Sequence, residues 1–326
     1  MPLPTAYGTI PLGGALPEAY VPGEAIPLLG GALESGYGEV SYAVNMTAAA
    51  SGSNGITVAD DDDIDFGTGD FFLHWEGSLP DWTPATTQTL LRKFVSAGYL
   101  TTLTSAGLFR VQIVTGTTYA STAPVAITDG ANAKLTAVIV RETASTAGSV
   151  VFYANGIQLG ASVAIAAASP ATINNSDPLY ISGTSTARTA SNTISCIVGN
   201  FAPTASEVLA LCTNGIPESW KWGSQTAQTS GTLTVGSTYR INTYVAGDDF
   251  TNVGAASNAS GVRFTATGTT PTTWTNSSSL VRIGATMALL PDTIPTSSAT
   301  TWSDTSGNTG GGTLPAAGAT KVTIRR

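Results

Sequence analysis

Charge is scarce in this chain. Its 326 residues include only 13 Lys and Arg and 21 Asp and Glu, which together make up 10% of the sequence. A helical enzyme is usually much richer in Glu, Lys, Leu and Arg, so the composition argues against that class. The formal net charge of -8 also argues against a basic stripe that follows nucleic-acid phosphates. We therefore expect no nucleic-acid partner.

Histidine and cysteine are almost absent. The single histidine, His74, excludes a metal site built from several histidines. We interpret it as a structural residue, because no nucleophile-elbow serine or cysteine and no orienting carboxylate stands out in the sequence. The two cysteines, Cys196 and Cys212, are too few for a disulfide scaffold. Their apolar surroundings favour two buried thiols, and whether they pair with each other is left open.

Long apolar runs are also missing. No stretch approaches the roughly 20 residues that a membrane-spanning helix needs. The amino terminus, MPLPTAYGTIPLGG, has neither the basic residues nor the continuous apolar core of a secretory signal. We therefore expect neither membrane insertion nor a signal peptide. The hydrophobic fraction of 42% nevertheless predicts a folded chain rather than a disordered one.

The sequence offers no obvious catalytic pair of acids. A glycoside hydrolase needs two carboxylates on one strand face, one as acid and the other as base or nucleophile. Here Glu76, Glu142 and Glu207 each stand without a second acid at a suitable spacing. Asp248 and Asp249 are adjacent, so on a strand they would point to opposite faces. We expect no catalytic residues and no enzyme activity.

Proline and glycine dominate the first forty residues, where AYGTIPLGGAL (6–16) is echoed by AYVPGEAIPLLGGAL (19–33). Repeated prolines fix φ and remove backbone donors, so neither a long helix nor a central strand is expected. We interpret residues 1–40 as an extended assembly arm that lays apolar side chains on a partner surface; an inert terminus is the alternative. The contact residues of this arm would be Tyr7, Ile10, Leu12, Tyr20, Ile26 and Leu28.

From about residue 41 the pattern is that of an antiparallel β protein. FRVQIVTG (109–116) alternates apolar and polar side chains, and KLTAVIVRE (134–142) is the short apolar run of a strand buried on both faces. Asn155-Gly156 separates two strand-like runs and favours a type I′ hairpin. Short strands divided by Gly, Asn, Asp and Ser turns predict an all-β sandwich or jelly roll over residues 41–222.

One helix is expected within this domain, at PTASEVLALCTNGIP (203–217). Thr204 and Glu207 have the spacing of a capping box, and Gly215 supplies a left-handed C-terminal cap. The apolar stripe of the helix would consist of Val208, Leu209, Leu211 and Cys212.

The remainder of the chain is rich in Thr, Ser and Gly. Residues 223–286 are expected to form a small β-rich module, with strands around Tyr239–Val245 and Val262–Ala266. Residues 287–326 form a Gly/Thr-rich C-terminal segment with a final strand candidate at Val322 and Ile324. We interpret this segment as a second arm that depends on a partner.

The order of the motifs resembles a laminin-G/concanavalin-A-like jelly roll. ITVADDDDIDFGTGDFFLHW is followed by GYLTTLTSAGLFRVQI, AVIVRETASTAGSVVFYANGIQLG, PLYISG and FAPTASEVLAL. The succession is similar to the versions of this domain in tail and head proteins of bacteriophages, over roughly residues 41–220. The stretch 231–278 is similar to a small β module of phage tail-associated proteins. The resemblance implies a β-sandwich in a virion, of tail-fibre or head-decoration type.

Aspartate occupies five of the six positions of DDDDID (60–65). If the run is strand-like, Asp61, Asp63 and Asp65 share one face while Ile64 and Phe66 point to the core. Ca²⁺ accepts such carboxylate ligands, although the run lacks the glycine and the terminal glutamate of an EF-hand loop. Laminin-G-like domains often bind Ca²⁺ at a sandwich rim, so the resemblance supports calcium as a cofactor. A solvated turn before a strand is the simpler interpretation.

Two functions from different classes follow. The leading hypothesis is a structural protein on the surface of a phage-like particle, held by its arms to other virion proteins in a homo-oligomer, with a trimer favoured. The alternative is a carbohydrate-binding adhesin that contacts a host surface glycan, with or without Ca²⁺. Six tryptophans could stack on sugars, but aromatic side chains in β-sandwiches are more often core residues. A capsule depolymerase ranks third, because the sequence shows no catalytic constellation.

Overall fold

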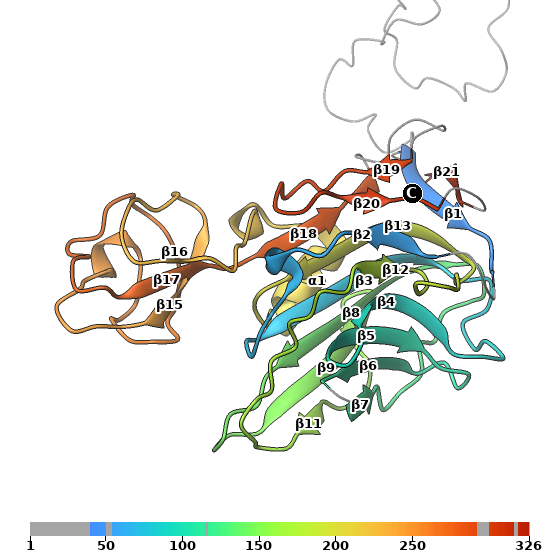
Figure 1. The fold of residues 1–326 in the computed structure, drawn as a ribbon, viewed down its shortest axis with the longest axis horizontal. Helices are drawn as coiled ribbons and strands as arrows, with labels where there is room; N and C mark the ends of the chain where they lie inside the picture. Colours follow the sequence, from blue (N-terminus) through green and yellow to red (C-terminus); the bar gives the residue numbers. More distant parts are fainter. Residues whose placement is uncertain (1–39, 50–53, 115–116, 292–299, 316–318, 326) are drawn as a thin grey trace, which may run out of the picture. The chain divides into compact units, whose positions relative to one another are not determined.

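The computed structural model describes residues 40–49, 54–114, 117–291, 300–315 and 319–325 (Figure 1). The six arm residues that the sequence analysis singled out all lie outside these ranges, so the assembly arm stays a prediction. Within the described residues, no helix has both the length and the apolar character needed to cross a membrane.

Two antiparallel sheets make up the main body, which confirms the predicted antiparallel β-sandwich. Sheet 1 has nine strands. Its main path runs through β10 (Ile157–Gln158), β9 (Gly148–Ala154), β8 (Asn132–Val140), β3 (Phe71–Ser78), β13 (Ser191–Gly199), β1 (Val40–Met46) and β21 (Ala319–Arg325), while β11 (Val163–Ile165) pairs with β9 and β18 (Ala285–Leu289) pairs with β13. Figure 1 shows β1 and β21, from opposite ends of the chain, side by side.

Sheet 2 has eight strands and packs against the inner face of sheet 1. Its order is β19 (Thr301–Trp302), β20 (Gly312–Thr313), β2 (Ile56–Val58), β12 (Leu179–Ile181), β4 (Gln88–Phe94), β5 (Gly98–Leu103), β6 (Phe109–Ile113) and β7 (Thr117–Ala120). The predicted alternation in β6 is confirmed, since Phe109, Val111 and Ile113 are buried while Arg110 and Gln112 are half-buried. Aromatic side chains from both sheets fill the core, because each of them removes a large apolar area from water.

Helix α1 (Ala205–Asn214) covers the outer face of sheet 1. Both hydrogen bonds of the predicted capping box between Thr204 and Glu207 are present. Val208, Leu211 and Cys212 are buried against outward-facing side chains of sheet 1. The prediction for Leu209 is wrong: it is 46% exposed, because it lies at the flank of the buried stripe, beside the Gly156 turn rather than over the body of the sheet.

The two cysteines are both free and buried. Cys196 lies in the core between the sheets, whereas Cys212 packs on the opposite side of sheet 1. The interpretation as two buried thiols is therefore confirmed. Burial raises the pKa of both thiols, which makes them unreactive.

The predicted hairpin at Asn155-Gly156 is also confirmed. Both residues have positive φ, of 51° and 81°, and they connect β9 to β10, where Ala154 pairs with Ile157. A type I′ turn requires this left-handed backbone at both central residues, which Asn and Gly adopt most easily.

The C-terminal segment differs most from the expectation. The sequence suggested a separate arm over residues 287–326, but the structure places β18 and β21 in sheet 1 and β19 and β20 in sheet 2. Trp302 is 0% exposed in the sandwich core. The jelly roll is therefore discontinuous, because the predicted module at 223–286 is inserted into it rather than appended after it.

The inserted module has its own sheet and core. Sheet 3 has the order β14 (Ala227–Gln228), β17 (Ser279–Arg282), β15 (Thr238–Thr243) and β16 (Arg263–Thr265). The two strands predicted from the sequence correspond to β15 and β16. The module also contains the short 3₁₀ turn η3 (Thr251–Val253). Two further 3₁₀ turns, η1 (Asp62–Ile64) and η2 (Glu218–Trp220), precede the module in the sequence.

Asp248 is the main polar anchor of the module. Its Oδ1 accepts hydrogen bonds from the backbone N–H groups of Thr275 at 2.7 Å and Asn276 at 2.9 Å, and its Oδ2 accepts from that of Ser278 at 2.9 Å. Burial acts to raise the pKa of Asp248, but these bonds to the charged form outweigh it and hold the pKa well below its usual range.

Replacing Asp248 by asparagine is expected to destabilise the module by about 2 kcal/mol, because the amide nitrogen cannot accept the Ser278 N–H. Since the folded-state pKa is depressed, the carboxylate stabilises the fold above its unfolded pKa of about 3.9, and this contribution is lost as the pH falls further. Urea unfolding of Asp248→Asn should accordingly depend less on pH below that value than wild-type unfolding does. Asp62→Asn is the matched control, since Asp62 is exposed; an equal loss in both variants would contradict the assignment.

Candidate functional site

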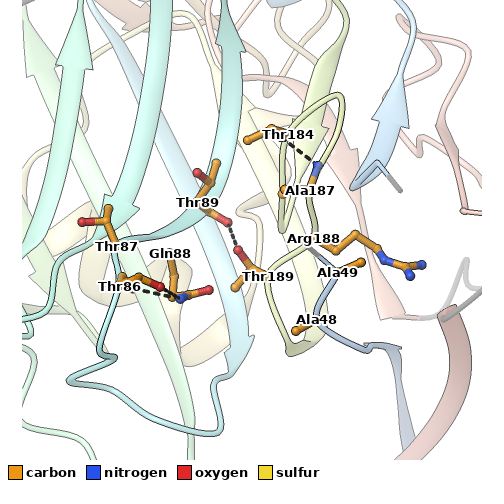
Figure 2. A pocket seen from close by; sticks show the side chains of 11 residues that line it. Ala48, Ala49, Thr86, Thr87, Gln88, Thr89, Thr184, Ala187, Arg188 and Thr189 are labelled. Atoms are coloured by element: carbon orange, nitrogen blue, oxygen red, sulfur yellow. Dashed lines mark hydrogen bonds between the residues drawn. The ribbon is translucent and has the colours of Figure 1, made fainter. Parts of the chain in front are cut away.

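A cleft of about 380 Å³ lies where three segments of the sandwich meet. They are Ala48 and Ala49 after β1, residues 86–89 at the start of β4, and residues 183–189 between β12 and β13. Figure 2 shows the side chains that line it. The polar lining residues are Thr86, Thr87, Gln88, Thr89, Thr184, Arg188 and Thr189.

Hydrogen bonds connect the backbone segments around the cleft. Arg188 and Ala49 exchange two backbone hydrogen bonds, of 2.8 and 3.3 Å, and the Thr184 N–H donates to the Ala187 carbonyl at 2.7 Å. The Thr189 hydroxyl donates to the Thr89 carbonyl at 2.8 Å, which joins the 183–189 loop to β4. The cleft is therefore preformed by its own hydrogen bonds and requires no ligand to hold its walls.

Several polar groups remain available for a ligand. Among the described residues, the exposed hydroxyl of Thr87 has no partner, and Gln88 uses its Nε2 on the Thr86 carbonyl at 2.8 Å, which leaves its Oε1 as an acceptor. The Arg188 guanidinium extends past Ala49 in Figure 2, away from the threonines of residues 86–89. The accessible chemistry of the cleft consists of neutral hydroxyl and amide groups, which donate to and accept from hydroxylated ligands.

Among the described residues that line the cleft there is no carboxylate, histidine or cysteine. They therefore do not supply the acid pair of a glycoside hydrolase. His74 lies elsewhere, on β3, where it is 2% exposed and its Nδ1 lies 2.8 Å from the Thr136 hydroxyl. Burial lowers the pKa of His74 to about 3, so its ring is neutral near pH 7.

A buried ionic network lies next to His74, and no motif in the sequence predicted it. The Ser195 hydroxyl donates to Glu76 Oε2 at 3.1 Å, and Lys134 Nζ lies 3.7 Å from Glu76 Oε1. Lys134 also donates to the Cys212 carbonyl at 2.6 Å, near the end of α1. The network joins three strands to the helix, and Glu76 and Ser195 are too buried to meet a substrate.

The aspartate run does not form the strand face that the sequence suggested. Residues 62–64 form the turn η1, in which the Asp61 carboxylate caps the backbone N–H of Asp63 at 2.9 Å. The Asp63 carboxylate accepts from the Gln225 N–H at 2.8 Å, and Asp65 lies 3.0 Å from Lys93 Nζ. The three candidate calcium ligands therefore have three different partners.

The core-facing part of that prediction is correct, since Ile64 and Phe66 are buried. Burial is also the main effect on two of the candidate ligands, and it raises the pKa of both Asp63 and Asp65. In the part of the chain that the structure describes, no three Asp, Glu, His or Cys side chains are grouped so that they could hold a metal ion. The calcium site at Asp61, Asp63 and Asp65 stays a prediction.

The tryptophans are core residues rather than a sugar platform. Trp75, Trp82, Trp220, Trp274 and Trp302 are at most 8% exposed, and Trp222 is half-buried. None of them lines the cleft. Sugar recognition by ring stacking therefore has no support at the cleft, and a ligand there would be bound through hydrogen bonds.

Comparisons with known proteins found similarity only to solved structures of low sequence identity. No family model matches the sequence, and no curated protein matches it either. A heptameric SAP-like pentraxin from Limulus polyphemus is 14% identical, with a TM-score of 0.42 over 54% of this chain and 84% of the pentraxin. A putative carbohydrate binding protein from Bacteroides ovatus is 14% identical, with a TM-score of 0.49 over 88% of this chain and 60% of that protein.

The binding domain of Paraclostridial Mosquitocidal Protein 1 is also similar, with 11% identity and a TM-score of 0.38 over 63% of this chain and 59% of that domain. The similarity to these solved structures concerns the β-sandwich alone. Because all three scores lie below 0.5, nothing about the cleft or its ligand follows from them.

Proposed function

We propose that this chain is a non-enzymatic carbohydrate-binding domain whose cleft takes a neutral, hydroxyl-rich glycan. The observation that carries the proposal is the cleft itself, a preformed hollow of about 380 Å³ lined by threonine hydroxyls and a glutamine amide. Its volume falls within the range of small-molecule sites, about 300–1,000 Å³. A sugar residue offers alternating hydroxyl donors and acceptors, which are the complement of this lining.

The charge of the residues that line the cleft favours a neutral ligand. Among the described residues that line the cleft, Arg188 alone is charged, and its guanidinium is directed away from the threonines of residues 86–89. An anionic ligand near those threonines would find no cation facing it. A cationic ligand would find no carboxylate among the lining residues. Hydrogen bonding between neutral groups is thus the interaction that this surface offers.

We expect the protein to bind neutral oligosaccharides on a glycan array. Glycans that end in uronic or sialic acid should not be bound. Binding measured in EDTA and in Ca²⁺ tests the calcium-dependent version of the hypothesis, because a chelator would abolish it. An array without any binding above background, in either buffer, would contradict the carbohydrate-binding proposal.

A structural role in a phage-like virion is the second candidate, and one observation favours it. β1 pairs with β21 over seven residues, from Val40 with Arg325 to Met46 with Ala319. β1 is therefore the second strand from one edge of sheet 1, between β13 and the C-terminal strand. An apolar arm that precedes β1 in the sequence would tether the sandwich to a particle through this strand pair.

This second role predicts an oligomer that depends on the arm. Light scattering of the full chain should give a trimeric mass, while a chain shortened to residues 40–326 should be a monomer with an unchanged circular dichroism spectrum. Because the shortened chain keeps β1, its sandwich should remain folded. Two monomers of equal stability would contradict the assembly role and leave glycan binding as the primary function.

A further inference from the structure

Lys93 on β4 is fully buried, and oxygen atoms surround its Nζ. Its side chain is 0% exposed, and its Nζ lies 2.6 Å from Asp60 Oδ1 and 3.0 Å from Asp65 Oδ1. It also donates to the backbone carbonyls of Asn175 at 2.6 Å and Asp177 at 3.1 Å. Four oxygens from two other segments thus surround one ammonium group, and we call this arrangement the Lys93 cage.

The donor set of the Lys93 cage is the kind that a hard metal cation prefers. Ca²⁺ is bound in proteins by carboxylates and backbone carbonyls, and the cage offers two of each. The two carboxylates also outnumber the single positive charge of Lys93. The distances of 2.6–3.1 Å are those of N–H···O hydrogen bonds, longer on average than the 2.3–2.6 Å of calcium ligands.

The cage is held in place by further contacts. The Asn175 side chain donates to the Ala97 carbonyl at 3.1 Å, and its Oδ1 accepts from the Asp177 N–H at 2.8 Å. A Cβ at Gly98 would collide with the Lys93 carbonyl oxygen, so the chain can pass this point only with glycine. The Asn175 side chain bonds to backbone groups alone, so the 175–177 loop keeps these contacts when the side chain at residue 93 is changed.

We propose that the Lys93 ammonium is the resident cation of this cage, in the place of a divalent metal ion. The aspartate run, β4 and the 175–177 loop are consequently joined without Ca²⁺, and removing the ammonium turns the same oxygens into a calcium site. The inference concerns Asp60 and Asp65, not the trio Asp61, Asp63 and Asp65. It does not depend on the proposed glycan binding.

Thermal unfolding of Lys93→Ala and Lys93→Gln in EDTA and in millimolar Ca²⁺ tests the proposal. The glutamine variant keeps most of the packing and adds an amide oxygen, which guards against simple misfolding of the alanine variant. Wild-type Tm is expected to be equal in both buffers. The Tm of the variants should fall in EDTA and rise again by at least about 4 °C in Ca²⁺, in proportion to the logarithm of its concentration. Potassium at equal ionic strength should have no such effect.

Two controls locate the effect. Adding Asp65→Asn to Lys93→Gln should remove the calcium response, because it neutralises one of the two carboxylates. Lys134→Ala, which leaves the single carboxylate of Glu76, should show none. The proposal is overturned if wild-type Tm falls in EDTA, or if neither Lys93 variant is more stable in Ca²⁺ than in EDTA.

Discussion

Replacing Trp302 by alanine is expected to lower the free energy of unfolding of the sandwich by about 3–5 kcal/mol, the usual cost of removing a buried tryptophan. The indole is 0% exposed in the core between the sheets. Its Nε1 donates to the Leu290 carbonyl at 2.8 Å, and this bond disappears with the ring. The cavity left behind would be lined by side chains from strands far away in the sequence.

The experiment decides whether the C-terminal segment belongs to the sandwich. Urea unfolding of Trp302→Ala should move to a lower midpoint with an unchanged slope, because stability changes and not the area exposed on unfolding. Ile157→Ala is the control, since Ile157 is 72% exposed and its loss should change stability by less than about 0.5 kcal/mol. If residues 287–326 were a separate arm, both variants would unfold like the wild type.

Removing the hydrogen-bonding groups of the cleft is expected to weaken glycan binding at least about tenfold, which corresponds to about 1.4 kcal/mol. Thr87→Val keeps the side-chain shape and removes a hydroxyl that has no partner among the described residues. Gln88→Leu removes the free Oε1 acceptor as well as the Nε2 bond to the Thr86 carbonyl. Both side chains are at the rim of the cleft, so Tm should remain within a few degrees of the wild type.

The same substitutions separate binding from structure. Thr118→Val is a matched control, because Thr118 is an exposed threonine of β7 that does not line the cleft. Its affinity for an array-positive glycan should equal that of the wild type. Equal affinity in Thr87→Val, Gln88→Leu and the control would show that the glycan binds elsewhere on the molecule.

Local sequence signals predicted the local structure well. The Asn155-Gly156 turn, the capping box of Thr204 and Glu207, and the alternation in β6 each depend on neighbouring residues, and the structure contains all three. The all-β class followed from many such short signals together. Leu209 shows the limit of this approach, because the stripe pattern identified the covered side of the helix but not how far the cover extends.

Long-range pairing could not be predicted. Thr57 pairs with Thr313, and Val44 pairs with Lys321. Hydrophobic periodicity describes only neighbouring residues, so it cannot predict pairs so far apart in the sequence. The Gly- and Thr-rich composition of the last forty residues suggested an arm, since β19 and β20 are only two residues long and β20 pairs with the distant strand β2. The strand-like alternation assumed for the aspartate run was wrong for the same reason. Asp65 and Asp63 contact distant residues, Lys93 and Gln225 respectively.

The cleft was invisible in the sequence. Its walls come from residues near positions 48, 87 and 188, and the threonines in them are ordinary turn and strand residues when taken one by one. The tryptophans drew attention instead, and the structure assigns most of them to the cores. A polar hollow whose described lining has no aromatic, acidic, histidine or cysteine residue leaves no motif, so only the folded arrangement reveals it.

Blocking the cleft with one bulky side chain tests the central claim most directly. Ala48 is exposed and lines the cleft, so Ala48→Trp should fill it without disturbing the fold. Ala144→Trp places the same ring on an exposed turn that does not line the cleft. In a calorimetric titration with an array-positive glycan, we expect no detectable binding to Ala48→Trp and wild-type affinity for Ala144→Trp. Wild-type affinity in both variants would contradict the assignment of this cleft as the glycan site.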